Sequence, residues 1–497
     1  MIFIYFQQKR RSDMDKEFSM AFSHNPYLPL WEHIPDGEPR VFGDRLYVFG
    51  SHDLENGHEF CEQDYVTWST PCDDLSKWRY EGIIYRKDQD PDNTDHQPLY
   101  APDVVQGPDG RYYLYYCVKF QDSIQVAVAD RPTGPYAFLG SVCYPDGRRM
   151  QENQPYDPSV LVDKGHVYLY FGFAPCMINI PRYKNQDLKG CSVVELAQDM
   201  RTVLQGPSIV LPSQRYGAGT AFEGNEYFEG PSIRKIGQTY YLLYSSVNTH
   251  QLCYATSTDP MHGFTYRGCI VSNGDVGYHG RKEADKLMSV GNDHGGLVKV
   301  NGTWYMFYHR HTSLNQYNRQ GCAEHVQILP DGSIPQVTIT TSGLHDGPLP
   351  GKGIYPAVLC CNLTNGHMGA LSSLGRTNKE VDFPYLASDA SPSMNEPDTE
   401  AERYIANISN GTKIGYKYLR LADTRKIRMR FRGTGDGHFW IRTQMDNEET
   451  NAGKLEIKQA DVWTDVAADT DFQESDQELY LVYEGTGKLD VLELQLF

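Results

Sequence analysis

The first 310 residues alternate apolar and polar positions in a unit that occurs five times. Each unit has an anchor residue, an apolar stretch with period-two alternation, a turn containing glycine, and an aromatic stretch that starts near a tyrosine. Such alternation around a tight glycine turn is typical of two antiparallel β-strands joined as a hairpin. The five strings are DGEPRVFGDRLY, PDVVQGPDGRYY, DPSVLVDKGHVY, EGPSIRKIGQTY and HGGLVKVNGTWY.

The unit keeps a fixed internal spacing. Its tyrosine follows the anchor by eleven positions, and consecutive anchors are 66, 55, 72 and 65 residues apart. This period is too long for a helical solenoid and matches a four-stranded blade with elaborated loops. We therefore predict an all-β fold with a five-bladed β-propeller, in which the anchors line the central channel and the tyrosines pack between blades. The anchors are Asp36, Pro102, Asp157, Glu229 and His294, and the tyrosines are Tyr47, Tyr113, Tyr168, Tyr240 and Tyr305.

A different pattern follows the repeats. Residues 343–356 are rich in Gly and Pro and are predicted to be a linker, whereas residues 357–497 contain short alternating stretches between Gly, Asp and Asn turns. The second region is predicted to be a β-sandwich. The predicted organisation is therefore a poorly packed N-terminal extension over 1–24, a propeller over 25–342, the linker, and the sandwich.

Composition narrows the possible partners. The chain has 497 residues, of which 40% are hydrophobic, and a formal net charge of −18. An acidic protein does not suit nucleic acid or an anionic membrane, because both require a basic surface. The first apolar run, MIFIYF, is too short for a membrane span, and its basic residues follow it, unlike those of a secretory signal. Eleven cysteines without CxxC spacing favour reduced thiols, so we expect a cytoplasmic protein.

Three anchors carry carboxyl groups, namely Asp36, Asp157 and Glu229. An Asp before Gly or Pro is also common in β-turns, but three acids at one phase of a propeller repeat should meet at the axis. Glycoside hydrolysis with inversion needs one protonated carboxyl and one ionised carboxylate. Repulsion within such a group would keep at least one member protonated near neutrality. A sugar-binding propeller without catalysis is the alternative.

The sequence resembles glycoside hydrolase family 43 over residues 25–340. The resemblance is carried by HIPDGEPRVFGDRLYVFGSHD, YAPDVVQGPDGRYYLYY, YDPSVLVDKGHVYLYFG, FEGPSIRKIGQTYYLLYSS and GNDHGGLVKVNGTWYMFYH. It implies a five-bladed propeller and an inverting mechanism. It also implies Asp36 as general base, Asp157 as the residue that modulates pKa and orientation, and Glu229 as general acid.

One departure concerns the first anchor. The family usually has Asp-Pro there, whereas here Asp36 precedes Gly37, and Glu38 precedes the proline. Glu38 is therefore a competitor for the role of base, but the eleven-residue distance to Tyr47 favours Asp36. Asp103 lies one position out of phase in the second unit and is interpreted as structural.

The resemblance implies further site residues. His294 matches the position of a histidine that contacts a calcium ion in many family members, although calcium generally prefers oxygen ligands. Arg319 resembles an arginine that contacts sugar hydroxyls. His52 and Asp53, in the string GSHD, are expected to line the pocket.

The C-terminal region resembles carbohydrate-binding modules of the family 6 type. Trp440 or Trp463 is a candidate platform for a sugar ring, but a tryptophan in a sandwich is more often part of the core.

Together these observations predict an exo-acting glycosidase that acts on arabinan- or xylan-derived oligosaccharides. α-L-Arabinofuranosidase is preferred, and β-xylosidase is the close alternative.

Overall fold

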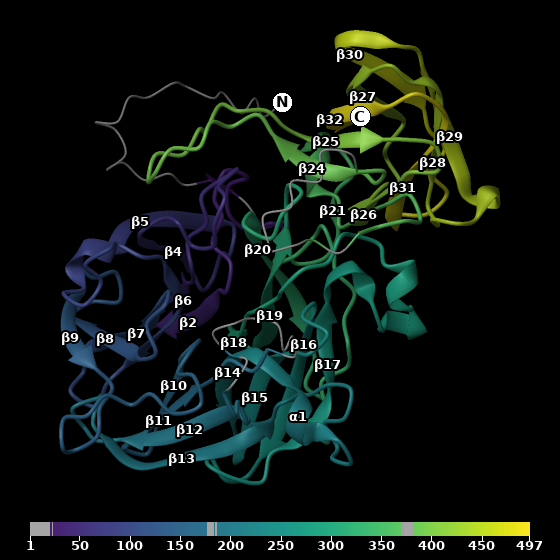
Figure 1. Cartoon of the computed structure of the whole chain (residues 1–497). Helices are drawn as coiled ribbons and strands as arrows, with labels where there is room; N and C mark the ends of the chain where they lie inside the picture. The colour runs from purple at the N-terminus through teal and green to yellow at the C-terminus, as the bar shows by residue number, and fades with distance from the viewer. Residues whose placement is uncertain (1–19, 22, 176–182, 184–185, 370, 372–380) are drawn as a thin grey trace.

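The computed structural model of the chain describes residues 20–21, 23–175, 183, 186–369, 371 and 381–497. The prediction of a poorly packed extension over 1–24 falls mostly outside these residues. The described chain is built of β-sheets, with five sheets in a ring and two further sheets beside it (Figure 1). The predicted all-β fold, a five-bladed propeller followed by a β-sandwich, is thereby confirmed. No helix in the described ranges is long and apolar enough to cross a membrane.

The blades are antiparallel sheets that follow one another in chain order. The first contains β2 (Glu38–Phe42), β3 (Arg45–Phe49), β4 (Tyr65–Pro71) and β5 (Lys77–Tyr85), with β1 (Met20–Ala21) paired to β5. The second contains β6 (Leu99–Gln106), β7 (Tyr112–Val118), β8 (Ile124–Ala129) and β9 (Ala137–Ser141). The third contains β10 (Ser159–Asp163), β11 (His166–Phe171), β12 (Gly190–Leu196) and β13 (Val203–Pro212). The fourth contains β14 (Tyr227–Ile236), β15 (Thr239–Ser246), β16 (Gln251–Ser257) and β17 (Thr265–Ser272), and the fifth contains β18 (Leu297–Val300), β19 (Thr303–His311) and β20 (Arg319–Val326).

The predicted glycine turns join the first two strands of each blade. In the third and fifth blades the turn residues Lys164 and Gly165, and Asn301 and Gly302, all have positive φ. Two successive residues in the left-handed region are the signature of a type I′ turn, whose twist matches that of the flanking strands. The turn therefore fixes the register that places each anchor at the start of the innermost strand.

Apolar side chains fill the spaces between adjacent blades. Each of five buried clusters combines residues of two neighbouring blades, and the five repeat tyrosines are at most 8% exposed within them. The seam between the first and fifth blades is closed by one such cluster, which includes Trp68 of β4 and Phe307 of β19. Within the described residues, no strand is shared across this seam. Side-chain packing, together with hydrogen bonds from Asn25 and Tyr27 to β20, therefore closes the ring.

The sandwich has two sheets around a separate apolar core. One sheet contains β21 (Leu349–Pro350), β26 (Lys413–Arg420), β31 (Asp476–Thr486), β28 (Asp436–Arg442) and β29 (Asn451–Ile457), with β23 (Asn362–Thr364) paired to β26. The other contains β24 (Tyr385–Ser388), β25 (Arg403–Ile408), β32 (Leu489–Leu496), β27 (Lys426–Gly433) and β30 (Ala460–Asp469), with β22 (Gly353–Pro356) paired to β32. Residues 349–356, expected as linker, thus contribute a strand to each sheet.

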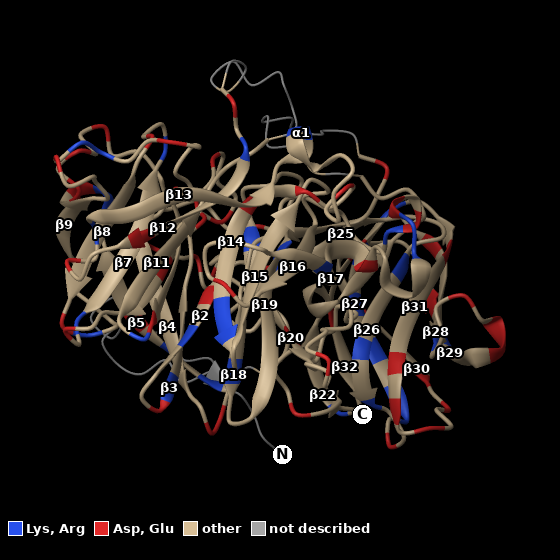
Figure 2. Cartoon of the chain, turned by 90° about the horizontal axis from the view of Figure 1, so that it is seen from below, with Lys and Arg blue, Asp and Glu red and all other residues tan. Residues whose placement is uncertain are grey.

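Helical structure is limited to single turns in the described chain. These turns are η2 (Lys87–Gln89), α1 (Gln214–Gly217), η3 (Asn273–Asp275), η4 (Tyr278–Gly280), η5 (Glu283–Asp285), η6 (Ala357–Leu359) and η7 (Glu448–Thr450). Acidic residues occur on loops around the whole molecule and do not gather on one face (Figure 2). The ten cysteines in the described ranges are all free thiols.

Candidate active site

The inner strands bring the predicted carboxyl anchors together at one end of the propeller axis. Asp36 precedes β2, Asp157 precedes β10, Glu229 lies in β14, and His294 precedes β18. The backbone N–H of Gly230 donates to Asp157 Oδ2 at 3.2 Å, and His294 Nδ1 lies 3.9 Å from Asp36 Oδ1. Gly230 has φ 63°, and a side chain there would meet the His294 ring at 2.9 Å. These contacts connect four blades around the carboxyl groups.

Asp36 is buried in a cationic environment. The Arg319 guanidinium donates through Nη1 to both carboxylate oxygens, at 3.0 and 3.2 Å. Burial alone would raise the pKa of Asp36, but the charge of the adjacent Arg319 guanidinium holds it below its usual value. The residue also has φ 57°, a conformation in which Asp is better tolerated than most residues. Asp36 is therefore held as an ionised carboxylate.

His309 is a site residue that the sequence analysis did not identify. Its Nδ1 accepts the backbone N–H of Asp36 at 3.2 Å, and its Nε2 lies 2.9 Å from the carbonyl oxygen of Asn292. Burial holds the pKa of His309 well below its usual value, so the ring is neutral with its proton on Nε2. His309 thereby fixes the backbone that carries Asp36. Its place in the aromatic strand of the fifth blade gave no separate sequence signal.

Asp157 and Glu229 have the opposite electrostatic character. Burial, assisted by the negative charge of Asp36, raises the pKa of Asp157 to about 6. Burial and repulsion from Asp157 and Asp36 raise the pKa of Glu229 well above its usual value. Glu229 is also the least buried of the three side chains. The site thus combines an ionised carboxylate with a carboxyl that stays protonated near neutrality.

The three residues expected to contact sugar have protein partners in the structure. Arg319 is 1% exposed, and besides Asp36 it binds both carboxylate oxygens of Asp53, at 2.8 and 2.9 Å. His52 Nε2 lies 3.0 Å from Glu32 Oε1. A buried guanidinium needs counter-charges, and two carboxylates supply them here. Arg319, held by Asp53, therefore supports the Asp36 carboxylate, whereas His52 pairs with Glu32.

Glu38 and Asp103 belong to a separate buried network deeper along the axis. Arg234 Nη2 donates to Glu38 Oε2 and Arg234 Nε donates to the carbonyl oxygen of Leu297, both at 2.6 Å. Arg40 Nε donates to Asp103 Oδ1 at 2.9 Å, and Arg40 also reaches a carbonyl of β10. We call these four charged side chains the axial network. It joins all five inner strands, and within it Glu38 is ion-paired with Arg234.

Removal of one cation from the axial network should destabilise the propeller. For Arg234→Met we expect the free energy of unfolding to fall by about 3–5 kcal/mol, because Glu38 remains buried without its nearest partner. Urea unfolding followed by tryptophan fluorescence measures the change. The control is Arg111→Met, whose guanidinium is 48% exposed beside Asp109 and whose loss should cost less than about 1 kcal/mol. Equal stability of the two variants would contradict the role of the network.

The donor groups at the predicted metal position suit calcium poorly. His294 is 4% exposed, and its Nε2 has no hydrogen-bond partner in the described part of the protein. Calcium prefers six to eight oxygen ligands, whereas His294 offers one nitrogen. Across the described ranges no group of three or more His, Cys, Asp or Glu side chains is placed to hold a metal ion. Direct coordination of calcium by the protein therefore does not fit this site.

The two candidate tryptophan platforms of the sandwich each face a cation. The Arg432 guanidinium lies 4.2 Å from the ring centre of Trp463, and the Lys454 ammonium lies 5.5 Å from that of Trp440. Cations stack favourably on indole faces. A sugar ring would have to use the opposite face or displace the cation.

A five-bladed propeller whose axial carboxyl groups have pKa values shifted in opposite directions is an arrangement that can support glycoside hydrolysis. Comparison with known proteins agrees, because residues 58–334 match the model of glycosyl hydrolases family 43. The chain belongs to this family and is a glycoside hydrolase. The match begins after Asp36 and includes Asp157, Glu229 and His294.

Relatives support the same assignment over most of the chain. A xylosidase/arabinosidase of Thermoclostridium stercorarium is 46% identical over 469 residues, which cover 93% of this chain and 96% of that protein. A xylosidase/arabinosidase of Bacteroides ovatus is 29% identical over 57% of this chain and 87% of its own length. Among solved structures, a GH43_1 enzyme from Xanthomonas citri complexed with xylotriose is 25% identical, with a TM-score of 0.50 over 66% of this chain and 96% of that one.

Proposed function

We propose that the protein is an inverting, exo-acting glycosidase that removes terminal α-L-arabinofuranosyl or β-D-xylosyl units from short oligosaccharides. Asp36 is the general base, Glu229 the general acid, and Asp157 the residue that tunes Glu229. The observation that carries the proposal is the opposite direction of the pKa shifts of Asp36 and Glu229 in one buried cluster. This is the pairing that single displacement at a glycosidic bond requires.

In this mechanism the two carboxyls act together on opposite faces of the sugar. Asp36 accepts a proton from water while the water oxygen attacks the anomeric carbon, and Glu229 donates its proton to the departing glycosidic oxygen. The product has inverted anomeric configuration, and Asp36 and Glu229 exchange protons with solvent before the next turnover. The Arg319 charge keeps Asp36 ionised, and burial together with the negative charge of Asp157 favours the protonated form of Glu229.

The proposed substrate class rests on the relatives. The relative with 46% identity and the one from Bacteroides ovatus are both named xylosidase/arabinosidase, and the Xanthomonas citri enzyme was solved with xylotriose. Pentose-containing oligosaccharides are therefore the first substrates to test. We keep arabinofuranosidase as the preferred activity and β-xylosidase as the alternative.

Aryl glycosides test the proposal. The wild type should release p-nitrophenol from the α-L-arabinofuranoside, the β-D-xylopyranoside or both, and the ratio of their kcat/KM values ranks the two activities. Proton NMR of the first-formed product should show the inverted anomer, and a tetrasaccharide should lose single monosaccharides. A retained anomer would exclude single displacement, and inactivity on both pentosides would exclude the substrate class.

Two expectations stay predictions. A β-xylosidase/α-arabinofuranosidase from a compost metagenome has been solved in a form described as calcium-free. For this chain we assign no mechanistic step to calcium, and a water-held ion near His294 is the form of binding still predicted. The cytoplasmic location is the other such prediction.

The pH dependence should follow the two shifted groups. kcat/KM should fall at low pH as Asp36 becomes protonated below its lowered pKa, and at high pH as Glu229 loses its proton above its raised pKa. Asp157→Asn removes a negative charge that raises the pKa of Glu229, so the alkaline limb should move to lower pH. A pH profile of kcat/KM for both proteins measures this. An unmoved or higher alkaline limb in the variant would contradict the tuning role.

A further inference from the structure

The loop between β3 and β4 is bound by ion pairs and hydrogen bonds to residues of the sandwich domain. Arg403, at the start of β25, forms a bidentate ion pair with Glu55 at 2.8 and 2.7 Å, and both side chains are at most 10% exposed. Asn56 Nδ2 donates to the carbonyl oxygens of Ser388 and Ala390, at 3.0 and 2.9 Å. These bonds join residues more than 330 positions apart in sequence.

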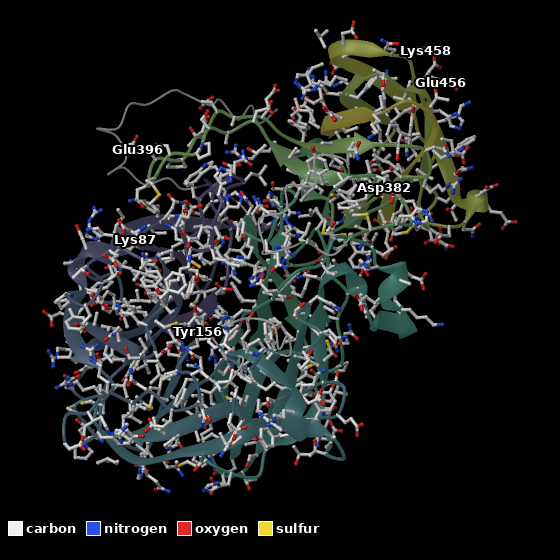
Figure 3. The ribbon with its side chains drawn as sticks, viewed as in Figure 1. Lys87, Tyr156, Asp382, Glu396, Glu456 and Lys458 are labelled. Carbon is white, nitrogen blue, oxygen red and sulfur yellow. The ribbon has the colours of Figure 1, made fainter. Side chains whose placement is uncertain are left out.

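A third contact lies at the far end of the same loop. The backbone N–H of Asn395 donates to Gln63 Oε1 at 2.7 Å, and its side-chain Nδ2 donates to Asp64 Oδ2 at 3.1 Å. The segment between β24 and β25 extends from the sandwich over the first blade, as the trace and the position of Glu396 show (Figures 1 and 3). We call residues 386–403 the clamp segment and residues 53–64 the clamped loop.

The inner face of the clamped loop holds the cation that faces the proposed base. Asp53 binds Arg319 through both carboxylate oxygens, and the Cys61 N–H donates to Asp53 Oδ1 at 3.0 Å. The Phe60 ring lies 4.9 Å from the Arg319 guanidinium. The clamped loop is thus sandwiched between the second domain and the Arg319–Asp36 pair.

We propose that the clamp segment is a positioning element of the active site, which holds the clamped loop so that Asp53 keeps Arg319 against Asp36. Arg403 and Asn395 are its positioning residues. The sandwich domain is then part of the catalytic unit in addition to any carbohydrate binding. This inference rests on the proposed role of Asp36 as the base.

Weaker contacts between the clamp segment and the clamped loop should change the pKa of Asp36. The titratable groups that interact with Asp36 are Arg319, His294, His309, His311, Asp53, Asp157, Glu229, Asp293, Cys61, Cys117 and Tyr65. Of these, Asp53 and Cys61 lie on the clamped loop, and Arg319 is bound by it. If the loop moves and Arg319 follows Asp53 away from Asp36, the attraction between the guanidinium and the carboxylate weakens, and the carboxylate is protonated at higher pH.

The test uses two variants of the full-length enzyme. Arg403→Met removes the ion pair with Glu55. Asn395→Gly removes the side-chain bonds but keeps the backbone N–H to Gln63, and glycine suits the φ of 55° at this position. Arg430→Met is the matched control, because its guanidinium pairs with Asp465 within the sandwich.

The expected result is a shift of the acidic limb of kcat/KM to higher pH by about one unit in both clamp variants, with the alkaline limb unchanged. Arg403→Lys should restore part of the shift. Each protein is assayed on an activated aryl glycoside, with pre-incubation at each pH to separate inactivation from titration. If Arg403→Met does not fold, the pH profile of kcat/KM for Asn395→Gly alone tests the inference.

Two results would overturn the inference. One is a lowered melting temperature in the clamp variants with the wild-type pH profile, which is what domain packing alone would give. The other is an equal shift in Arg430→Met. The proposed function fails by a different result, namely full activity of Asp36→Ala, so the two failures are distinguishable.

Discussion

Glu229→Gln should lower kcat/KM on xylobiose or arabinobiose by about 10²–10⁴-fold, the usual contribution of a general acid. The amide has the shape of the carboxyl group but cannot supply a proton to a poor leaving group. A p-nitrophenolate ion departs without protonation, so the loss on the aryl glycoside should be far smaller. Steady-state kinetics on both kinds of substrate measures this selectivity.

The matched control for Glu229→Gln is Glu324→Gln. Glu324 is another buried glutamate of raised pKa, and it is hydrogen-bonded by Asn25, Tyr308 and Thr340 away from the proposed site. Its substitution should affect both substrate kinds alike. Equal losses on the two substrate kinds in Glu229→Gln would remove Glu229 from the role of acid.

Asp36→Ala should abolish activity even on activated substrates, since without a base the attacking water is not deprotonated. We expect a loss of about 10³-fold or more, because the variant removes both the base and the counter-charge of buried Arg319. Azide needs no deprotonation and fits the space left by the carboxylate, so it should restore turnover and yield a glycosyl azide of inverted configuration. Product NMR with and without azide measures this.

Glu38→Gln separates Asp36 from its competitor in the sequence. Glu38 is bound by Arg234 in the axial network, so its substitution should lower stability while the surviving folded enzyme keeps its kcat. Wild-type activity in Asp36→Ala, or an azide-rescued loss in Glu38→Gln, would move the role of base to Glu38.

The repeat phase was sufficient to predict which acids meet, and the reason is geometric. In a propeller, residues at the start of the inner strands lie around one axis. Repeat phase alone therefore predicts that Asp36, Asp157 and Glu229 lie together, although they span 193 positions of the sequence. Asp103 is one position out of phase and is therefore not expected among these acids, and the structure places it in the axial network.

The side-chain contacts around these acids could not be predicted from the sequence pattern. Arg319 was expected to meet substrate, but its partners Asp36 and Asp53 lie on the first blade, and no periodicity encodes a contact between side chains of different blades. The bonds of Asn395 to the clamped loop arise from an irregular segment, where alternation carries no signal. Residues 349–356 were interpreted as linker because Gly and Pro mask strands of two to four residues.

The contacts that close the ring predict the order in which activity and β-structure are lost on heating. Asp36 lies at the junction of the first and last blades, which is held by an isolated backbone bridge between Gly37 and Gly295, by the ion pairs of Arg319 with Asp36 and Asp53, and by side-chain packing. Regions joined without a continuous hydrogen-bonded sheet tend to open at lower free energy than the rest of a protein. Thermal inactivation should therefore precede the loss of β-structure, because a small parting of these two blades separates the base from the acid while each sheet remains intact.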